Sequence, residues 1–131
     1  MSKQVTTVSE EGYASDNSVR DFDLTIDATG EEGPDTLEAL LAAYGSCYVP
    51  ALRVGAEQRD VGDLGRVEID VNGDLNDDDK LAAVQFHVRT DAEMDDGQAE
   101  AVAERANELC KVHDALKAEL AAEIEIDGHA V

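Results

Sequence analysis

The chain has 131 residues, of which 43% are hydrophobic, so it is long enough to bury a core and is not a disordered polypeptide. Its 31 acidic and 10 basic side chains give a formal net charge of −21. Such a charge repels nucleic-acid phosphates and anionic lipid head groups, so we expect neither nucleic acid nor a membrane as a partner. Because the carboxylates are spread over the whole chain, we interpret them as adaptation to a salt-rich cytoplasm, with an acidic binding surface as the alternative.

The length and the absence of a linker predict a single domain over residues 1–131. No apolar run approaches the roughly 20 residues that cross a bilayer, and the first residues lack a secretory pattern, so we expect a cytoplasmic protein. Two cysteines without a Cys-x-x-Cys pair favour free or redox-active thiols over a zinc site. His87 and His129 have no partner pattern, so we expect no metal and no cofactor.

The N-terminal part of the chain predicts strands and then a loop. A short β-branched strand is expected at residues 3–9. Residues 18–27 alternate apolar and polar side chains from Phe22 to Ile26, which predicts a single half-buried strand. The loop at residues 28–35 contains Gly30, Gly33 and Pro34.

The next segment predicts a long central helix, over residues 35–60, around which the rest of the chain is organised. Asp35 is the expected N-cap and Glu38 completes a capping box. Pro50 predicts an irregularity or kink within the helix. The apolar positions follow the three-and-four spacing of one helical face, and Cys47 lies on this face: Leu37, Leu40, Leu41, Tyr44, Tyr48, Ala51 and Leu52.

The second half of the chain predicts two strands, a helix and a last strand. Residues 67–75 and 82–90 alternate and are expected to pair antiparallel. A second helix begins at Asp95 and Asp96, carries Cys110 on its apolar face, and bends or breaks after Lys111. Residues 122–127 form the last strand. These elements predict an α+β fold, an antiparallel β-sheet with two long helices on one face that carry the cysteines.

The two cysteine segments, GPDTLEALLAAYGSC ending at Cys47 and CKVHDAL beginning at Cys110, resemble those of the OsmC/Ohr family of thiol peroxidases. The order of elements is also similar, over nearly the whole chain. The resemblance implies an intertwined homodimer with active sites at the subunit interface. It implies that Cys47 attacks the peroxide and Cys110 resolves the product, with Arg20 and Glu38 as the arginine and acid of the site. Lys111 stands where the family has proline.

The chemistry expected of these residues begins with a thiolate, because a thiolate rather than a thiol attacks peroxide oxygen. Arg20 would stabilise the thiolate and Glu38 would orient Arg20. Cys47 would become a sulfenic acid, Cys110 would condense with it to a disulfide, and an external dithiol would reduce the disulfide. Apolar walls suit an organic hydroperoxide; we expect Leu40, Tyr44, Tyr48 and Phe86 to supply them.

Simpler roles remain for several of these residues. Glu38 could serve only as a capping acid, Arg20 as a solvated strand residue, and His113 as either a base or a packing residue. Two other functions also stay open. The chain could bind an apolar ligand or a thiol carrier at the dimer cleft without peroxidase activity, or it could be a structural acidic partner of a basic protein.

Overall fold

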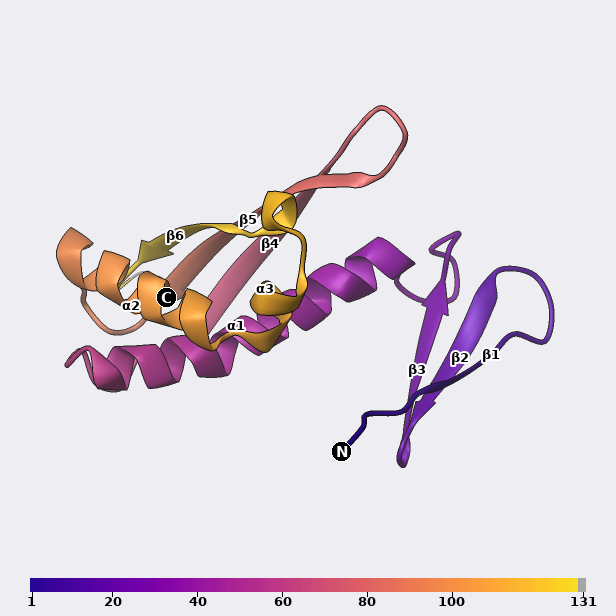
Figure 1. Cartoon of the computed structure of the whole chain (residues 1–131), viewed down its shortest axis with the longest axis horizontal. Coiled ribbons are helices and arrows are strands. Elements are labelled where there is room, and N and C mark those ends of the chain that lie inside the picture. The colour runs from indigo at the N-terminus through magenta and orange to yellow at the C-terminus, as the bar shows by residue number, and fades with distance from the viewer. Residues whose placement is uncertain (130–131) are drawn as a thin grey trace. The chain divides into compact units, whose positions relative to one another are not determined.

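A computed structural model describes residues 1–129 and has the predicted α+β class (Figure 1). The chain divides into two compact units, Met1–Leu40 and Leu41–Val131, each of which has its own three-stranded sheet. The single domain over residues 1–131 stays a prediction. Within the described residues, no helix is both long and apolar enough to cross a membrane.

The first unit contains the antiparallel sheet β1-β2-β3, formed by β1 (Thr6–Val8), β2 (Ala14–Val19) and β3 (Phe22–Asp27). The prediction of one strand over residues 18–27 is wrong, because the chain reverses at Arg20 and Asp21 and Val19 pairs with Phe22. Arg20 has φ of 55°, in the left-handed region that few non-glycine residues adopt. The polar strand β2 was missed because ASDNSV has no apolar alternation.

The apolar residues of β3 are more exposed than predicted. Phe22 and Leu24 are 61% and 56% exposed in the single chain, whereas a half-buried strand was expected. Val5, Val8 and Tyr13 of the same unit are also exposed. The first unit therefore presents large apolar side chains that its own sheet leaves uncovered.

The loop after β3 is ordered by the carboxylate of Asp27. Its Oδ1 accepts hydrogen bonds from Thr29 N at 2.9 Å and Thr29 Oγ1 at 2.8 Å, and its Oδ2 accepts one from Glu32 N at 3.1 Å. These hydrogen bonds, led by that from the Thr29 amide, lower the pKa of Asp27. The loop ends at the start of helix α1 (Thr36–Gln58).

The start of α1 is the predicted capping box. Glu38 N donates to Asp35 Oδ1 at 2.8 Å, and Asp35 N donates to Glu38 Oε1 at 2.9 Å. These two bonds satisfy amides that have no partner within the helix. The helix continues through Pro50 to Gln58.

The second unit builds its sheet from β4 (Val67–Leu75), β5 (Leu81–Thr90) and β6 (Glu123–Asp127), in the order β4-β5-β6 (Figure 1). The antiparallel pairing of β4 and β5 is confirmed. However, β6 is parallel to β5, with Phe86 opposite Ile124, so the predicted sheet is not antiparallel throughout. The helical connection between these strands brings the chain back to the end from which β5 began, which produces a parallel pair.

That connection contains α2 (Asp96–Leu109), α3 (Lys111–Ala115) and the 3₁₀ turn η1 (Ala118–Leu120). The predicted break is present, but it falls at Cys110, which has extended backbone angles and caps both helices. The second thiol therefore lies at a helix junction. The prediction that it lies on the apolar face of a helix is wrong.

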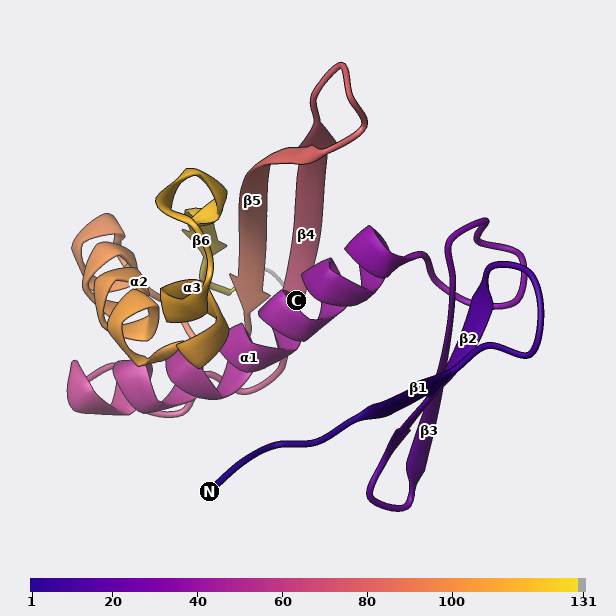
Figure 2. The ribbon, with the colours of Figure 1, turned by 45° about the vertical axis from the view of Figure 1, so that its right-hand side comes forward.

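The core of the second unit lies between the helices and the sheet. Helices α1 and α2 approach closely at Gly55, where an added Cβ would lie 3.3 Å from Val102 O. The largest fully buried side chains are those of Tyr44, Tyr48, Phe86, Leu52, Leu64, Val88 and Val102. Figures 1 and 2 both show α3 alongside the middle of α1, the part of the helix that carries Cys47.

Candidate functional site

The second unit brings the two cysteines together, although they are far apart in the sequence. Cys47 lies on α1 and is partly exposed, while Cys110 at the junction of α2 and α3 is 1% exposed. Each thiol shifts the pKa of the other, and Cys47 packs against the core cluster that includes Cys110. This pairing of an accessible thiol with a buried one is the central feature of the site.

The surroundings of Cys47 favour its thiolate. Partial burial raises the pKa of the Cys47 thiol, but four interactions oppose this effect. The backbone amides of Val112 and Lys111, the Cys110 thiol and the positive charge of Lys111 all stabilise the ionised sulfur, so the pKa of Cys47 is lowered. Cys47 is therefore the better nucleophile of the pair at neutral pH.

Cys110 has the opposite tendency. Burial is the main cause that raises its pKa, and the neighbouring Cys47 adds to the increase. The His113 amide donates to Cys110 Sγ at 3.5 Å and only partly offsets these effects. Cys110 is thus held as a neutral thiol next to the more readily ionised Cys47.

A cavity of about 360 Å³ opens beside Cys47. It is lined by Cys47, Pro50, Ala51, Val54, Leu109 and Lys111. The predicted walls were wrong for Tyr44, Tyr48 and Phe86, whose side chains are fully buried in the core. Leu40, the fourth predicted wall residue, belongs to the first unit and is not among the residues that line this cavity.

The actual walls on α1 could have been found from helical spacing. Pro50, Ala51 and Val54 lie three, four and seven residues after Cys47, and thus on its own face of the helix. The apolar pattern assigned the aromatic residues to the same broad face but did not distinguish a cavity wall from the core.

His113 is held by a tyrosine. Its Nδ1 lies 2.5 Å from Tyr44 Oη, which also accepts a hydrogen bond from Ala122 N at 2.8 Å. Burial raises the pKa of Tyr44, so the phenol keeps its proton at neutral pH. The arrangement favours the packing role of His113 over that of a free base.

Glu38 and Arg20 both lie in the first unit. The Glu38 carboxylate accepts from Asp35 N in the capping box. The guanidinium of Arg20 lies over the Phe22 ring, 5.1 Å from its centroid. In the described part of the chain, Arg20 and Glu38 form no ion pair with each other, and their pairing at the site stays a prediction.

His87 has partners that the sequence did not reveal. Its Nε2 lies 2.5 Å from Asp127 Oδ2, its Nδ1 lies 3.3 Å from Arg89 Nη1, and Glu125 is close enough to join the group. The parallel register of β5 and β6 places His87 opposite Glu125, and this register could not be read from the sequence. Because both ring nitrogens already have protein partners, we interpret the group as a hydrogen-bond network on the sheet.

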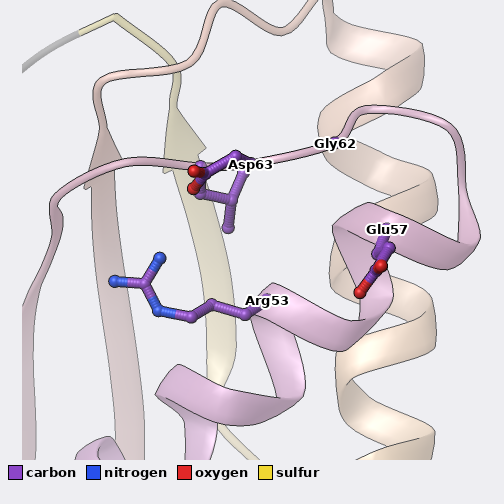
Figure 3. Close-up of a pocket in the computed structure, with 5 residues that line it drawn as sticks. Arg53, Glu57, Gly62 and Asp63 are labelled. Atoms are coloured by element: carbon purple, nitrogen blue, oxygen red, sulfur yellow. The ribbon is translucent and has the colours of Figure 1, made fainter.

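A second cavity of about 270 Å³ lies between the end of α1 and the loop that follows it. Figure 3 shows Arg53 and Glu57 on the helix and Asp63 on the loop. Arg53 Nη1 donates to Gly65 O at 2.8 Å, which fixes the loop to the helix. This cavity contains no thiol, so the chemistry of the two cysteines belongs to the cavity at Cys47.

Comparison with known proteins shows the family of the chain. The family described as OsmC-like protein matches residues 28–125. An uncharacterised protein of Haloferax volcanii is 45% identical over 127 residues, which cover 97% of this chain and 96% of that protein.

Solved structures share the fold. The OsmC-like protein of Mycoplasma pneumoniae superposes with a TM-score of 0.84 at 17% identity, covering 98% of this chain and 97% of that one. The organic hydroperoxide resistance protein OhrB of Bacillus subtilis superposes with a TM-score of 0.72 at 22% identity, covering 97% and 98%. The sequence match over most of the chain and the shared architecture show that the chain belongs to the OsmC-like protein family.

Proposed function

We propose that this protein is a thiol-dependent peroxidase that reduces organic hydroperoxides at Cys47. The observation that carries the proposal is the pair of interacting cysteines whose pKa values are shifted in opposite directions, lowered at Cys47 and raised at Cys110. A peroxidase needs such a difference, since one sulfur must be ionised and accessible while the other waits as a thiol. The hydroperoxide resistance named for the structurally similar OhrB supports the same reaction class.

In the first step, the Cys47 thiolate attacks the terminal oxygen of the hydroperoxide ROOH. The O–O bond breaks, the oxygen bound to R leaves as the alcohol ROH after taking up a proton, and Cys47 becomes a sulfenic acid. The substrate is reduced by two electrons and the sulfur is oxidised by two. Four apolar side chains, those of Pro50, Ala51, Val54 and Leu109, line the adjacent cavity and suit an organic R group.

In the second step, the Cys110 sulfur attacks the sulfenic sulfur of Cys47. A disulfide forms between the two cysteines and water leaves. An external dithiol then reduces the disulfide by thiol–disulfide exchange and is itself oxidised to a disulfide. No bound cofactor is required by this cycle.

The remaining parts of the proposal concern Arg20, Glu38 and the assembly. Arg20 would stabilise the thiolate and Glu38 would orient it, in a site completed by a homodimer. The exposed Phe22 and Leu24 support a dimer, since apolar groups of this size are commonly covered by a partner. The charge of −21 supports a salt-adapted cytoplasmic protein.

The test is steady-state consumption of cumene hydroperoxide in high salt with dithiothreitol as the reductant. We expect Cys47→Ser to abolish turnover, because serine is far less readily ionised than cysteine. Cys110→Ser should still reduce about one equivalent rapidly and leave a sulfenic acid that dimedone traps. Full activity in Cys47→Ser would refute the mechanism.

A second function is favoured by one observation. Glu38 is already engaged in the capping box, so the arginine–acid pair of a peroxidase site is not formed within the described chain. In that case the protein would bind an apolar ligand or a thiol carrier without reducing peroxides. Saturable binding of a fluorescent apolar probe, lost in Val54→Asp, together with unreactive thiols would favour this function.

A further inference from the structure

Lys111 occupies an unusual place in this acidic protein. It is the first residue of α3, directly follows Cys110, and lines the same cavity as Cys47. The other residues that line this cavity are apolar, apart from Cys47 itself. Lys111 is therefore the only charged side chain among the described residues that line the cavity.

Lys111 is exposed, and its charge is the smallest of the four interactions that lower the pKa of Cys47. Apolar walls on one side of the cavity reduce the screening of its charge by water and salt. The backbone of Lys111 adds a second contribution, because its amide lies at the start of a helix where it has no partner within the helix. That amide also lowers the pKa of Cys47.

We propose that Lys111 activates Cys47 by stabilising its thiolate, through its ammonium charge and its main-chain N–H. The inference rests on the proposed function, since it names a residue that prepares the nucleophile of that reaction. Lys111 belongs to the same unit as Cys47, whereas Arg20 belongs to the first unit. The proposed effect of Lys111 therefore does not depend on Arg20.

The other groups around Cys47 do not supply this charge. Cys110 acts on Cys47 as a neutral thiol, and burial raises the pKa values of Tyr44 and Tyr48 on α1. His113 is bound to Tyr44. Among the acids of α2 and α3, Glu108 pairs with Arg105 at 2.8 Å, and Asp114 is exposed. Cys110 and Lys111 are the titratable groups that lower the pKa of Cys47, and Lys111 is the one that carries a positive charge.

Three substitutions separate the two contributions of Lys111. Lys111→Arg keeps the charge and the amide, and Lys111→Gln keeps only the amide. Lys111→Pro removes both, and it suits the fold because proline is favoured at the first position of a helix. Lys117→Gln is the matched control, because Lys117 is an exposed lysine after α3 that is not among the residues lining the cavity.

The measurement is the rate of alkylation of Cys47 by iodoacetamide as a function of pH, in high salt, with the modified cysteine identified by peptide mass. A raised pKa leaves less thiolate at any pH below it, so alkylation slows. At neutral pH we expect rates about threefold lower in Lys111→Gln and about tenfold lower in Lys111→Pro. Lys111→Arg and Lys117→Gln should match the wild type.

Titration curves of Lys111→Gln and Lys111→Pro that coincide with that of the wild type would overturn the inference. If Lys111→Pro fails to fold, as judged by circular dichroism, Lys111→Gln decides alone. Alkylation needs no peroxide, so this test is independent of turnover. A Lys111-dependent titration without peroxide reduction would refute the proposed function and leave the role of Lys111 intact.

Discussion

At the scale of single residues, the two sulfurs differ because of where the backbone places them. The Val112 and Lys111 amides at the start of α3 lower the pKa of Cys47, while Cys110 is enclosed in the core. Ionised sulfur is stabilised by the first environment and disfavoured by the second. The opposite pKa shifts of the two thiols give a physical reason for the roles of Cys47 as attacking thiol and Cys110 as resolving thiol, which the sequence suggested only by resemblance. Both roles stay predictions.

Tyr44 links the site to the sheet and gives a prediction at this scale. Tyr44→Phe removes the oxygen that accepts from the Ala122 amide, and Ala122 is only 8% exposed. A buried amide without a partner costs about 1–3 kcal/mol. We therefore expect the free energy of unfolding to fall by roughly that amount in urea titrations at high salt. Tyr13→Phe is the control, because Tyr13 is 76% exposed. Equal stability of Tyr44→Phe and the control would contradict this role of the hydroxyl.

Residue-scale predictions from the sequence succeeded where the chemistry is local. The capping box of Asp35 and Glu38 depends on residues three apart and was predicted correctly. The acidic partner of His87, Asp127, lies on a strand 40 residues away, and no local pattern reveals this contact. The lining of the cavity was also missed, because periodicity identifies a face and not the depth of each side chain on it.

At the scale of elements, regular apolar spacing predicted helices and strands correctly, but the order and direction of the strands were not all predicted. The strand Val67–Leu75 and the long helix α1 were predicted within a residue or two, since their apolar spacing is regular. The hairpin turn at Arg20 was missed because it contains neither glycine nor asparagine, the residues typical of such turns. The parallel position of β6 depends on how the helical connection crosses the sheet, which the strand sequence does not encode.

The exposed side chains of β3 give the prediction at this scale. Phe22 and Leu24 lie two residues apart on one face of the strand, so they can contact a second chain together. We expect light scattering in high salt to give twice the 14.0 kDa mass of the chain, and the double variant Phe22→Asp, Leu24→Asp to give a single chain mass. Leu75→Asp is the control, because Leu75 is 52% exposed in the other unit. A monomeric wild type would contradict the proposed dimer.

At the scale of the whole molecule, the charge of −21 makes stability depend on salt. Carboxylates repel one another, and dissolved ions screen this repulsion. Raising KCl from 0.2 M to 3 M should therefore increase the melting temperature by about 4 °C or more, which corresponds to about 1 kcal/mol for a chain of this size.

The loop between β4 and β5 provides the matched variant for this salt effect. Changing Asp77, Asp78 and Asp79 to asparagine removes three neighbouring charges, and asparagine tolerates the positive φ of Asp79. The triple variant should gain less from KCl than the wild type. A melting temperature that is independent of salt would show that the charge has no part in stability.

The central claim is that Cys47 and Cys110 act as a redox pair. The most direct test mixes the reduced protein, in high salt, with one equivalent of cumene hydroperoxide and follows free thiols and intact mass over seconds. The account predicts that both thiols disappear, that each chain loses two mass units as the disulfide forms, and that a dithiol restores both. Thiols that survive excess hydroperoxide for minutes would contradict it.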